Sequence, residues 1–330
     1  MEDSRTIPEL LANLIKKHKS RLLLQRRDGW SWKQITWLDF ESEVKNIASF
    51  LLSMGFNIGD TVLMISSNNN ECLMSEIAVY SLGGRVIPFS SFDSFSVYDK
   101  SVAGTKPRFV FVENQRYLKE LENNSNVLDK TEKIFIFDDS KVGGDEKTVP
   151  YKAAVKFGQI KKKELSDKLG ERLEQIGPDQ TALTIYAGEG DNITESNFDH
   201  KDIIGMLSRA YDRLKFVSSE DQSYSYIVTT ELFEKLIHIL AICLGIRLII
   251  AEDKQCFYED ILEAKPTILF ETKSGIEEIC NKLNGTSLKY MLGGRVKYLI
   301  TDEEPEDIIS DRFRSEKINV IPLPQFSKLN

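Results

Sequence analysis

The fold is decided by residues 61–89, which read TVLMISSNNNECLMSEIAVYSLGGRVIPF. An apolar run at 61–66 is followed by a helical pattern over 71–82, and a second apolar run occupies 85–89. Strands that are apolar on both faces and joined by a helix are typical of a parallel sheet with helices on both sides. The stretch therefore predicts a strand–helix–strand unit of an α/β domain.

The same alternation extends in both directions along the chain. Thr36, with Asp39 three residues later, marks the start of a long helix that ends at Gly55. Residues 138–150, rich in Gly, Asp and Lys, form a surface loop. The other elements predicted in the first half are a helix at 6–15, strands at 21–27, 108–112 and 133–137, and a linker helix at 160–176.

The second half repeats this pattern after a clear boundary. Ile176-Gly177-Pro178-Asp179 is the strongest break in the chain, so the first lobe is expected at 1–177 and the second at 178–330. The sequence thus predicts two packed α/β lobes with mostly parallel sheets. The elements expected in the second lobe are strands at 182–186, 224–228, 246–251, 267–270, 296–301 and 318–321, and helices at 198–214, 232–244, 258–264 and 275–283.

Charge limits the classes of partner. The 330 residues hold 43 Lys and Arg against 51 Asp and Glu, a formal net charge of -8. General binding to a phosphate backbone needs clustered basic residues, and the only basic run is Lys161–Lys163, which we interpret as a solvated helix face. We therefore expect no nucleic-acid partner.

Cysteine, histidine and apolar spacing exclude further classes. The four cysteines include no C-x-x-C pair and the three histidines are dispersed, so we expect no metal site and no disulfide framework. His200 and His238 are interpreted as structural residues. The N-terminus does not resemble a secretory signal, and the longest apolar stretch, Leu236–Leu244, is too short to span a bilayer. A cytoplasmic location without a membrane span is the expectation.

Several short strings together resemble a known family. In order, they are Gly29-Trp30-Ser31-Trp32, Gly55-Phe56-Asn57-Ile58-Gly59-Asp60, Gly83-Gly84-Arg85-Val86-Ile87-Pro88, Lys106-Pro107-Arg108-Phe109-Val110 and Lys265-Pro266-Thr267-Ile268-Leu269. Their order and spacing are similar to those of the large N-terminal domain of the adenylate-forming superfamily, which includes the acyl-CoA synthetases. The resemblance implies that fold, and a reaction in which a carboxylate attacks the α-phosphate of ATP and pyrophosphate leaves.

The resemblance also implies a phosphate-binding loop, rich in Ser, Thr and Gly and ending in a lysine, after the strand at 182–186. The candidate residues of the corresponding loop are Tyr186, Gly188, Gly190, Asp191 and Thr194. This loop has no lysine, and Glu189, Asp191 and Glu195 place negative charge where a triphosphate would lie. Because like charges repel strongly when partly desolvated, we interpret the segment as a degenerate nucleotide loop without catalytic or metal-binding residues.

Other signatures of the family are replaced as well. After the strand at 224–228, Thr230 and Glu231 stand where the resemblance implies a loop with Pro and His. After the strand at 296–301, Asp302 and Glu303 stand where it implies a Gly-Gly-Ala turn. These four residues mark the expected cleft for an acyl or nucleotide-like ligand. The family's mobile C-terminal domain, with its catalytic lysine, is expected to be absent.

The sequence therefore predicts an atrophied, non-catalytic acyl-CoA synthetase-like protein that serves as a ligand-binding or regulatory module, with no cofactor. One alternative is a subunit of an ATP-dependent acid–CoA ligase whose C-terminal domain is supplied by another chain, which would use ATP and magnesium. Another is a structural subunit docked on an intact paralogue. The apolar segment 318–326 is expected to be exposed, so a homo- or hetero-oligomer is predicted through this C-terminal face.

Overall fold

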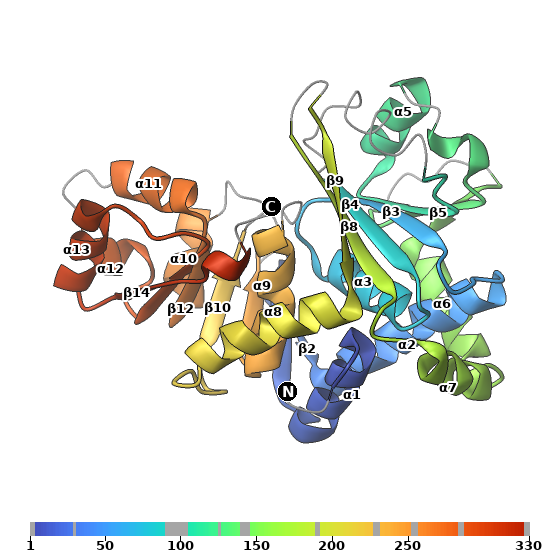
Figure 1. The fold of residues 1–330 in the computed structure, drawn as a ribbon, viewed down its shortest axis with the longest axis horizontal. Coiled ribbons are helices and arrows are strands. Elements are labelled where there is room, and N and C mark those ends of the chain that lie inside the picture. Colours follow the sequence, from blue (N-terminus) through green and yellow to red (C-terminus); the bar gives the residue numbers. More distant parts are fainter. Residues whose placement is uncertain are drawn as a thin grey trace. The chain divides into compact units, whose positions relative to one another are not determined.

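The structure is a computed structural model, and it divides the chain into two compact units with one sheet each (Figure 1). Unit 1 comprises the described residues of 1–17 and 38–204, and unit 2 those of 18–37, 205–227 and 232–330. The residues that the structure describes are 4–28, 31–89, 105–124, 127–138, 146–188, 192–226, 232–251, 257–282 and 287–326.

These units do not follow the boundary between 177 and 178 that the sequence predicts. Strand β8 (Thr181–Ala187) pairs with β4 (Arg85–Phe89) in the sheet of unit 1. Strand β1 (Leu22–Asp28) pairs with β11 (Arg247–Ile250) in the sheet of unit 2. The division is decided by strand pairing between residues far apart in the sequence. A local break in composition, such as the one at 176–179, does not show which strands pair.

The sheet of unit 1 has the strand order β7-β6-β5-β3-β4-β8-β9, in which every pair is parallel except the β8-β9 hairpin. Its other strands are β3 (Thr61–Ile65), β5 (Phe109–Val112), β6 (Lys133–Ile136), β7 (Thr148–Pro150) and β9 (Thr194–Asp199). The helices around it are α1 (Ile7–His18), α2 (Trp37–Ser53), α3 (Asn70–Tyr80), α5 (Gln115–Asn124), η1 (Val127–Lys130), α6 (Tyr151–Lys161) and α7 (Ser166–Gln175). Helix α8 (His200–Arg213) begins in unit 1 and continues in unit 2.

Both faces of this sheet are covered, as its continuous apolar strands predict. On one face, Val110 and its neighbours pack with Leu118 and Leu121 of α5. On the other, Phe135 meets Phe50 of α2 edge to face, with ring centroids 5.6 Å apart. Because successive side chains of a strand point to opposite faces, a strand buried on both sides must be apolar throughout.

The sheet of unit 2 has the order β14-β13-β12-β10-β11-β1-β2, with the β1-β2 hairpin as its antiparallel pair. Its strands β10 to β14 thus occupy the same places as β3 to β7 in unit 1. The two sheets have the same spatial order of strands, but the antiparallel hairpin follows these five strands in unit 1 and precedes them in unit 2. The remaining strands are β2 (Ser31–Thr36), β10 (Gln222–Ser225), β12 (Ile268–Glu271), β13 (Tyr298–Thr301) and β14 (Asn319–Pro322). Its helices are α9 (Leu232–Leu244), α10 (Phe257–Ala264), α11 (Lys273–Asn281), α12 (Leu288–Met291), α13 (Asp307–Ser315) and η3 (Pro324–Phe326).

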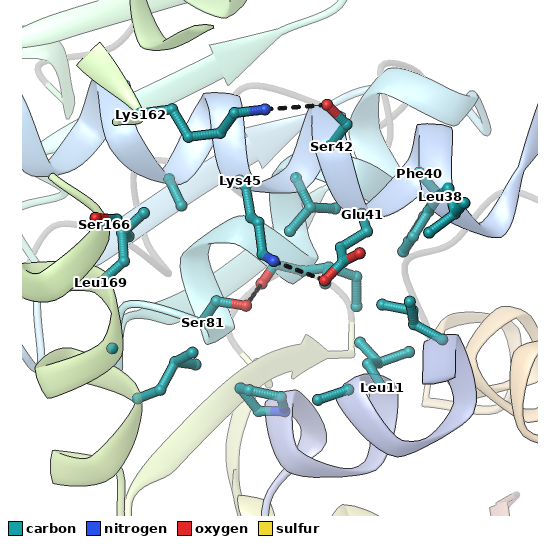
Figure 2. A pocket seen from close by; sticks show the side chains of 18 of the residues that line it. Leu11, Leu38, Phe40, Glu41, Ser42, Lys45, Ser81, Lys162, Ser166 and Leu169 are labelled. Atoms are coloured by element: carbon teal, nitrogen blue, oxygen red, sulfur yellow. Dashed lines mark hydrogen bonds and ion pairs between the residues drawn. The ribbon is translucent and has the colours of Figure 1, made fainter. Parts of the chain in front are cut away.

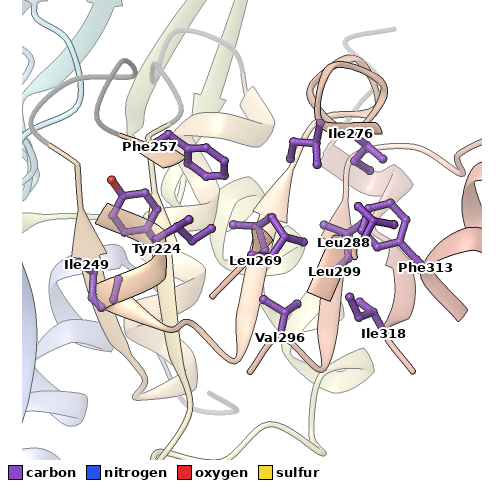
Figure 3. Close-up of a cluster of buried hydrophobic side chains, with 14 of the residues drawn as sticks. Tyr224, Ile249, Phe257, Leu269, Ile276, Leu288, Val296, Leu299, Phe313 and Ile318 are labelled. Atoms are coloured by element: carbon purple, nitrogen blue, oxygen red, sulfur yellow. The ribbon is translucent and has the colours of Figure 1, made fainter. Parts of the chain in front are cut away.

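One face of the unit 2 sheet holds a continuous apolar core. Figure 3 shows Tyr224, Leu269 and Leu299 of the strands together with Ile276 of α11 and Phe313 of α13. Helix α9 covers the opposite face. Its His238 bonds to Ser225, whose side chain points to the other face of the sheet from that of its neighbour Tyr224 on β10. The sheet is therefore also enclosed on both sides.

Several element predictions are corrected by the structure. The linker helix expected at 160–176 is the end of α6 and, after a turn, α7. The helix expected from 198 begins at His200, because 194–199 pair with β8 as strand β9. In strand β2, Ile35 is buried and Trp32 packs partly against the core, while the other four residues are polar. This apolar pattern is too weak to predict a strand, which depends on pairing with β1. The short strand β7 and the helices α12 and α13 also had no prediction.

The closing segment is less exposed than the sequence predicts. Strand β14 does lie at the edge of its sheet, but Ile318 and Leu323 are buried and Phe326 is only 1% exposed. The Phe326 ring lies 6.3 Å from that of Phe233 in α9. The expected uncovered apolar face is therefore wrong for these residues, while self-association stays a prediction.

No helix in the described part of the chain is long and apolar enough to cross a membrane.

Candidate functional site

The carboxyl ends of β3 and β5 form a topological switch point in unit 1. The chain leaves β3 for a neighbour on one side and returns through β5 on the other, and open α/β sheets bind ligands outside such strand ends. Here Glu113, directly after β5, accepts a hydrogen bond of 2.7 Å from the backbone amide of Ser67, which follows β3. A carboxylate of the chain itself therefore spans the crevice.

Unit 2 repeats this arrangement at the equivalent strand ends. Glu271 closes β12, is 2% exposed, and accepts hydrogen bonds from the Tyr226 hydroxyl beyond β10 and from the amide of Thr272 at 2.9 Å. Burial, with the neighbouring Glu271 carboxylate, raises the pKa of Tyr226, so this phenol keeps its proton and acts as a donor. In both units a glutamate occupies the switch point.

Backbone amides in the first turn of α11 also donate hydrogen bonds to side chains. Thr272 caps the helix by accepting from the amide of Gly275 at 3.1 Å, and Asp302 accepts from the amide of Lys273 at 2.8 Å. Helix N-terminal amides are the groups that commonly bind phosphates. In α11 they are bonded to side chains that the same unit supplies.

The structure describes two of the four cleft residues expected from the sequence. Asp302 lies at the start of α11, and the carbonyl of Glu303 accepts a 2.6 Å hydrogen bond from the Thr301 hydroxyl. Thr230 and Glu231 lie outside the described residues. Sequence reasoning missed Glu271, although an acidic residue at the end of the apolar run Ile268–Glu271 was a usable signal, since a buried charge needs specific partners.

The nucleotide loop predicted around 186–194 is the connection of the β8-β9 hairpin. Thr194 belongs to β9 and donates to the carbonyl of Ala187 at 3.1 Å. Gly188 has φ +115°, and a Cβ there would lie 2.1 Å from the carbonyl oxygen of Asn192. Only glycine fits at 188, and the space above it is filled by the chain's own backbone. Gly190 and Asp191, with Glu189, lie outside the described residues.

The base of this hairpin holds a fixed negative charge. Glu195 accepts hydrogen bonds of 2.9 Å from the Asn197 amide and of 2.9 Å from the Tyr186 hydroxyl, and these bonds lower the pKa of Glu195. The pKa of Tyr186 is raised, first by burial and then by Glu195, and its ring stacks on Phe89 with centroids 6.0 Å apart. No lysine or arginine occurs from 173 to 200. The site thus offers an ionised carboxylate and no cation from its own loop.

The two histidines considered from the sequence are both buried. His200 accepts from the amide of Ile7 through Nδ1 at 3.4 Å, and burial lowers its pKa to about 4. His238 bonds to the Ser225 hydroxyl through Nε2 at 2.9 Å, and burial lowers its pKa to about 3. Both are neutral near pH 7 and neither touches the strand-end groups described above.

No cluster of His, Cys, Asp and Glu suited to a metal ion is present within the described ranges.

Comparison with known proteins defines the class. The model of the family "AMP-binding enzyme" matches residues 14–188, more than half of the chain, and the chain belongs to this family. The α/β fold predicted from the sequence, and its likeness to the N-terminal domain of acyl-CoA synthetases, are thereby confirmed.

Individual relatives give the extent of the similarity. The chain is 24% identical over 269 residues to Probable CoA ligase CCL5 of Humulus lupulus, which covers 80% of this chain and 43% of that protein. The chain therefore spans less than half the length of this relative. Among solved structures, VinN in complex with 3-methylaspartate is 14% identical with a TM-score of 0.75, covering 96% of this chain and 76% of VinN. The N-terminal domain of FACL13 from Mycobacterium tuberculosis is 12% identical with a TM-score of 0.72, covering 96% and 75%. At these identities the structural likeness concerns the fold.

Proposed function

We propose that this chain is a non-catalytic member of the AMP-binding enzyme family that serves as a ligand-binding or regulatory module. The observation that carries the proposal is the hairpin between β8 and β9, where Glu195 is held ionised and no basic residue is available from 173 to 200.

Electrostatics oppose a triphosphate at this hairpin. Two unit charges of the same sign roughly 4 Å apart repel by about 4 kcal/mol at the effective dielectric constant of a partly shielded site. An ATP phosphate next to Glu195 would meet this repulsion, and the loop supplies no lysine to offset it. The positive charge of Arg85 on β4 also acts on Glu195, but its guanidinium already donates to the Thr61 hydroxyl. The carboxylates of Glu189 and Asp191 add to the negative charge of the same loop.

The backbone amides that follow the carboxyl ends of the strands already donate hydrogen bonds to carboxylates. Ser67, Thr272 and Lys273 donate their backbone N–H groups to Glu113, Glu271 and Asp302. A phosphate would have to displace one of these buried or half-buried carboxylates, which would then lose its hydrogen bonds. Ligands without a high negative charge, such as acyl groups or a nucleoside, fit this edge better than a triphosphate.

The test measures pyrophosphate release from ATP and magnesium with a panel of carboxylic acids. We expect no acid-dependent release above a boiled control, while an active ligase of the same family serves as positive control. Acid-dependent release by the purified protein would refute the non-catalytic assignment.

The competing function is that of a subunit in an ATP-dependent acid–CoA ligase whose other domain comes from a second chain. Family membership and the match to a CoA ligase favour it. The same assay, repeated with co-purified partner chains and coenzyme A, separates the two functions. Pyrophosphate release that requires a partner chain would support the ligase subunit. If Glu195→Lys also changes this release, catalysis would be assigned to the hairpin of this chain.

A further inference from the structure

Unit 1 contains a cavity of about 710 Å³ that shares no residue with the strand-end site (Figure 2). It lies between α1, α2 and α7, with Ile77 of α3 and the turn after α6 completing its wall. Its volume is in the range of pockets that bind small molecules. We call it the helical cavity.

The walls of the helical cavity are largely aliphatic. They include Leu11 and Ile15 of α1, Val44 and Ala48 of α2, and Leu169 of α7. Pockets for small organic ligands have such apolar walls with a few polar groups that fix the orientation of the ligand.

Apolar side chains at the helical cavity remain partly uncovered. Leu165 and Ile176, which flank α7, are buried, but α7 itself contains no buried residue. Leu173 of α7 is 43% exposed and Leu38 of α2 is 48% exposed. An amphipathic helix normally buries its apolar stripe, so the cavity leaves apolar surface that a ligand would cover.

Lysine side chains also line the helical cavity. Lys45, Lys162 and Lys163 line the cavity, against the single carboxylate of Glu41. Figure 2 shows Lys45 paired with Glu41 over the cavity, at 2.6 Å, and Lys162 reaching Ser42 of α2, at 3.1 Å. In a chain with a net charge of -8, this local excess of lysine selects for an anionic group beside an apolar one.

We propose that the helical cavity binds a single-chain amphiphile with an anionic head group, its alkyl chain lying along α1, α2 and α7. The head group lies at Lys162 and Lys163, two members of the basic run in the sequence, and the Ser166 hydroxyl of α7 lies on the same wall. This proposal goes beyond the proposed function, since it holds whether or not the chain activates a carboxylate.

The first experiment is titration calorimetry of the whole chain with decanoate, acetate, decan-1-ol and decylammonium, each below its aggregation limit. Decanoate is expected to bind once per chain, with affinity rising about fourfold per added methylene until the cavity is full. Acetate is expected not to bind, and the alcohol and the amine at least tenfold more weakly. No decanoate binding, or equal affinity for the alcohol, would overturn the proposal; the latter would indicate a purely apolar groove of the kind that receives a partner helix.

The second experiment locates the head group. Lys162→Gln with Lys163→Gln should weaken decanoate binding about tenfold, since each partly exposed ion pair contributes up to several-fold. The matched control is Lys156→Gln with Lys168→Gln, which removes the same charge from exposed positions of α6 and α7 outside the cavity wall and should change nothing. Equal effects of the two pairs would refute a specific head-group position.

A third variant fills the cavity. A Cβ added at Gly170 meets no atom within 4 Å, so Gly170→Trp can place its ring in the helical cavity without a clash at the backbone. It should lower decanoate affinity at least tenfold while circular dichroism shows unchanged folding. Unchanged affinity in a folded Gly170→Trp protein would mean that the amphiphile binds elsewhere.

Discussion

Gly158 lies in α6 where this helix meets α2. A Cβ at this position would lie 1.8 Å from the backbone oxygen of Asn46 and 3.2 Å from Cβ of Phe50. Because the opposing atom belongs to the backbone, it cannot rotate away as a flexible side chain would. In Gly158→Ala, α6 and α2 must therefore separate by more than an ångström.

The expected size follows from opposing effects. Alanine in a helix interior is favoured over glycine by about 1 kcal/mol, whereas forcing a methyl group into a packed interface costs typically about 1–3 kcal/mol, sometimes more. Separation also weakens the edge-to-face contact of Phe50 with Phe157, whose centroids are 5.6 Å apart; such pairs contribute about 0.5–1.5 kcal/mol. We predict a net loss of about 1–3 kcal/mol. Since Lys162 and Lys163 follow α6, decanoate affinity should fall as well.

The assay is urea unfolding followed by far-UV circular dichroism, with hydrogen exchange at the amides of α2 and α6 to place the change in unit 1. Gly170→Ala is the control, because it is also helical but faces open space, and it should stabilise the protein by about 0.5–1 kcal/mol. Equal or greater stability of Gly158→Ala would refute the close contact of α6 with α2.

Three further predictions concern the hairpin, a buried histidine and the C-terminal segment. Replacing Glu189 and Asp191 with Ser and Glu195 with Lys should raise ATP affinity at least about tenfold in calorimetry if charge repulsion excludes the nucleotide; no gain would assign the exclusion to backbone shape. The pKa of His200 is about 4 when folded and about 6.5 when unfolded, so its contribution to stability is complete above about pH 6.5. That contribution is lost as pH falls toward 4, by up to about 1.4 kcal/mol per pH unit, and a His200→Gln variant with the same pH slope of unfolding would contradict this. Phe326→Glu should destabilise unit 2 by about 3 kcal/mol or more, because the ring is buried, and an unchanged thermal transition would show that it is not.

The sequence alone determined the elements whose signal is local. The run Thr61–Ile65 is buried at every position, as its apolar character predicts, and the helix after Thr36 begins at Trp37. The absence of a basic residue from the hairpin was also readable without coordinates, because it depends only on residue types between 173 and 200. These features follow from the periodicity and chemistry of neighbouring residues.

Only the tertiary structure decided which residues meet. Glu113 and Ser67 are 46 positions apart, and Glu271 and Tyr226 are 45 apart, yet each pair joins two strand ends of one sheet. The helical cavity likewise depends on how α1, α2 and α7 pack, since an apolar stripe does not state how completely it is covered. Sequence patterns fix which side chains need burial or partners. The partner itself is set by strand order and helix packing, which join segments far apart in the chain.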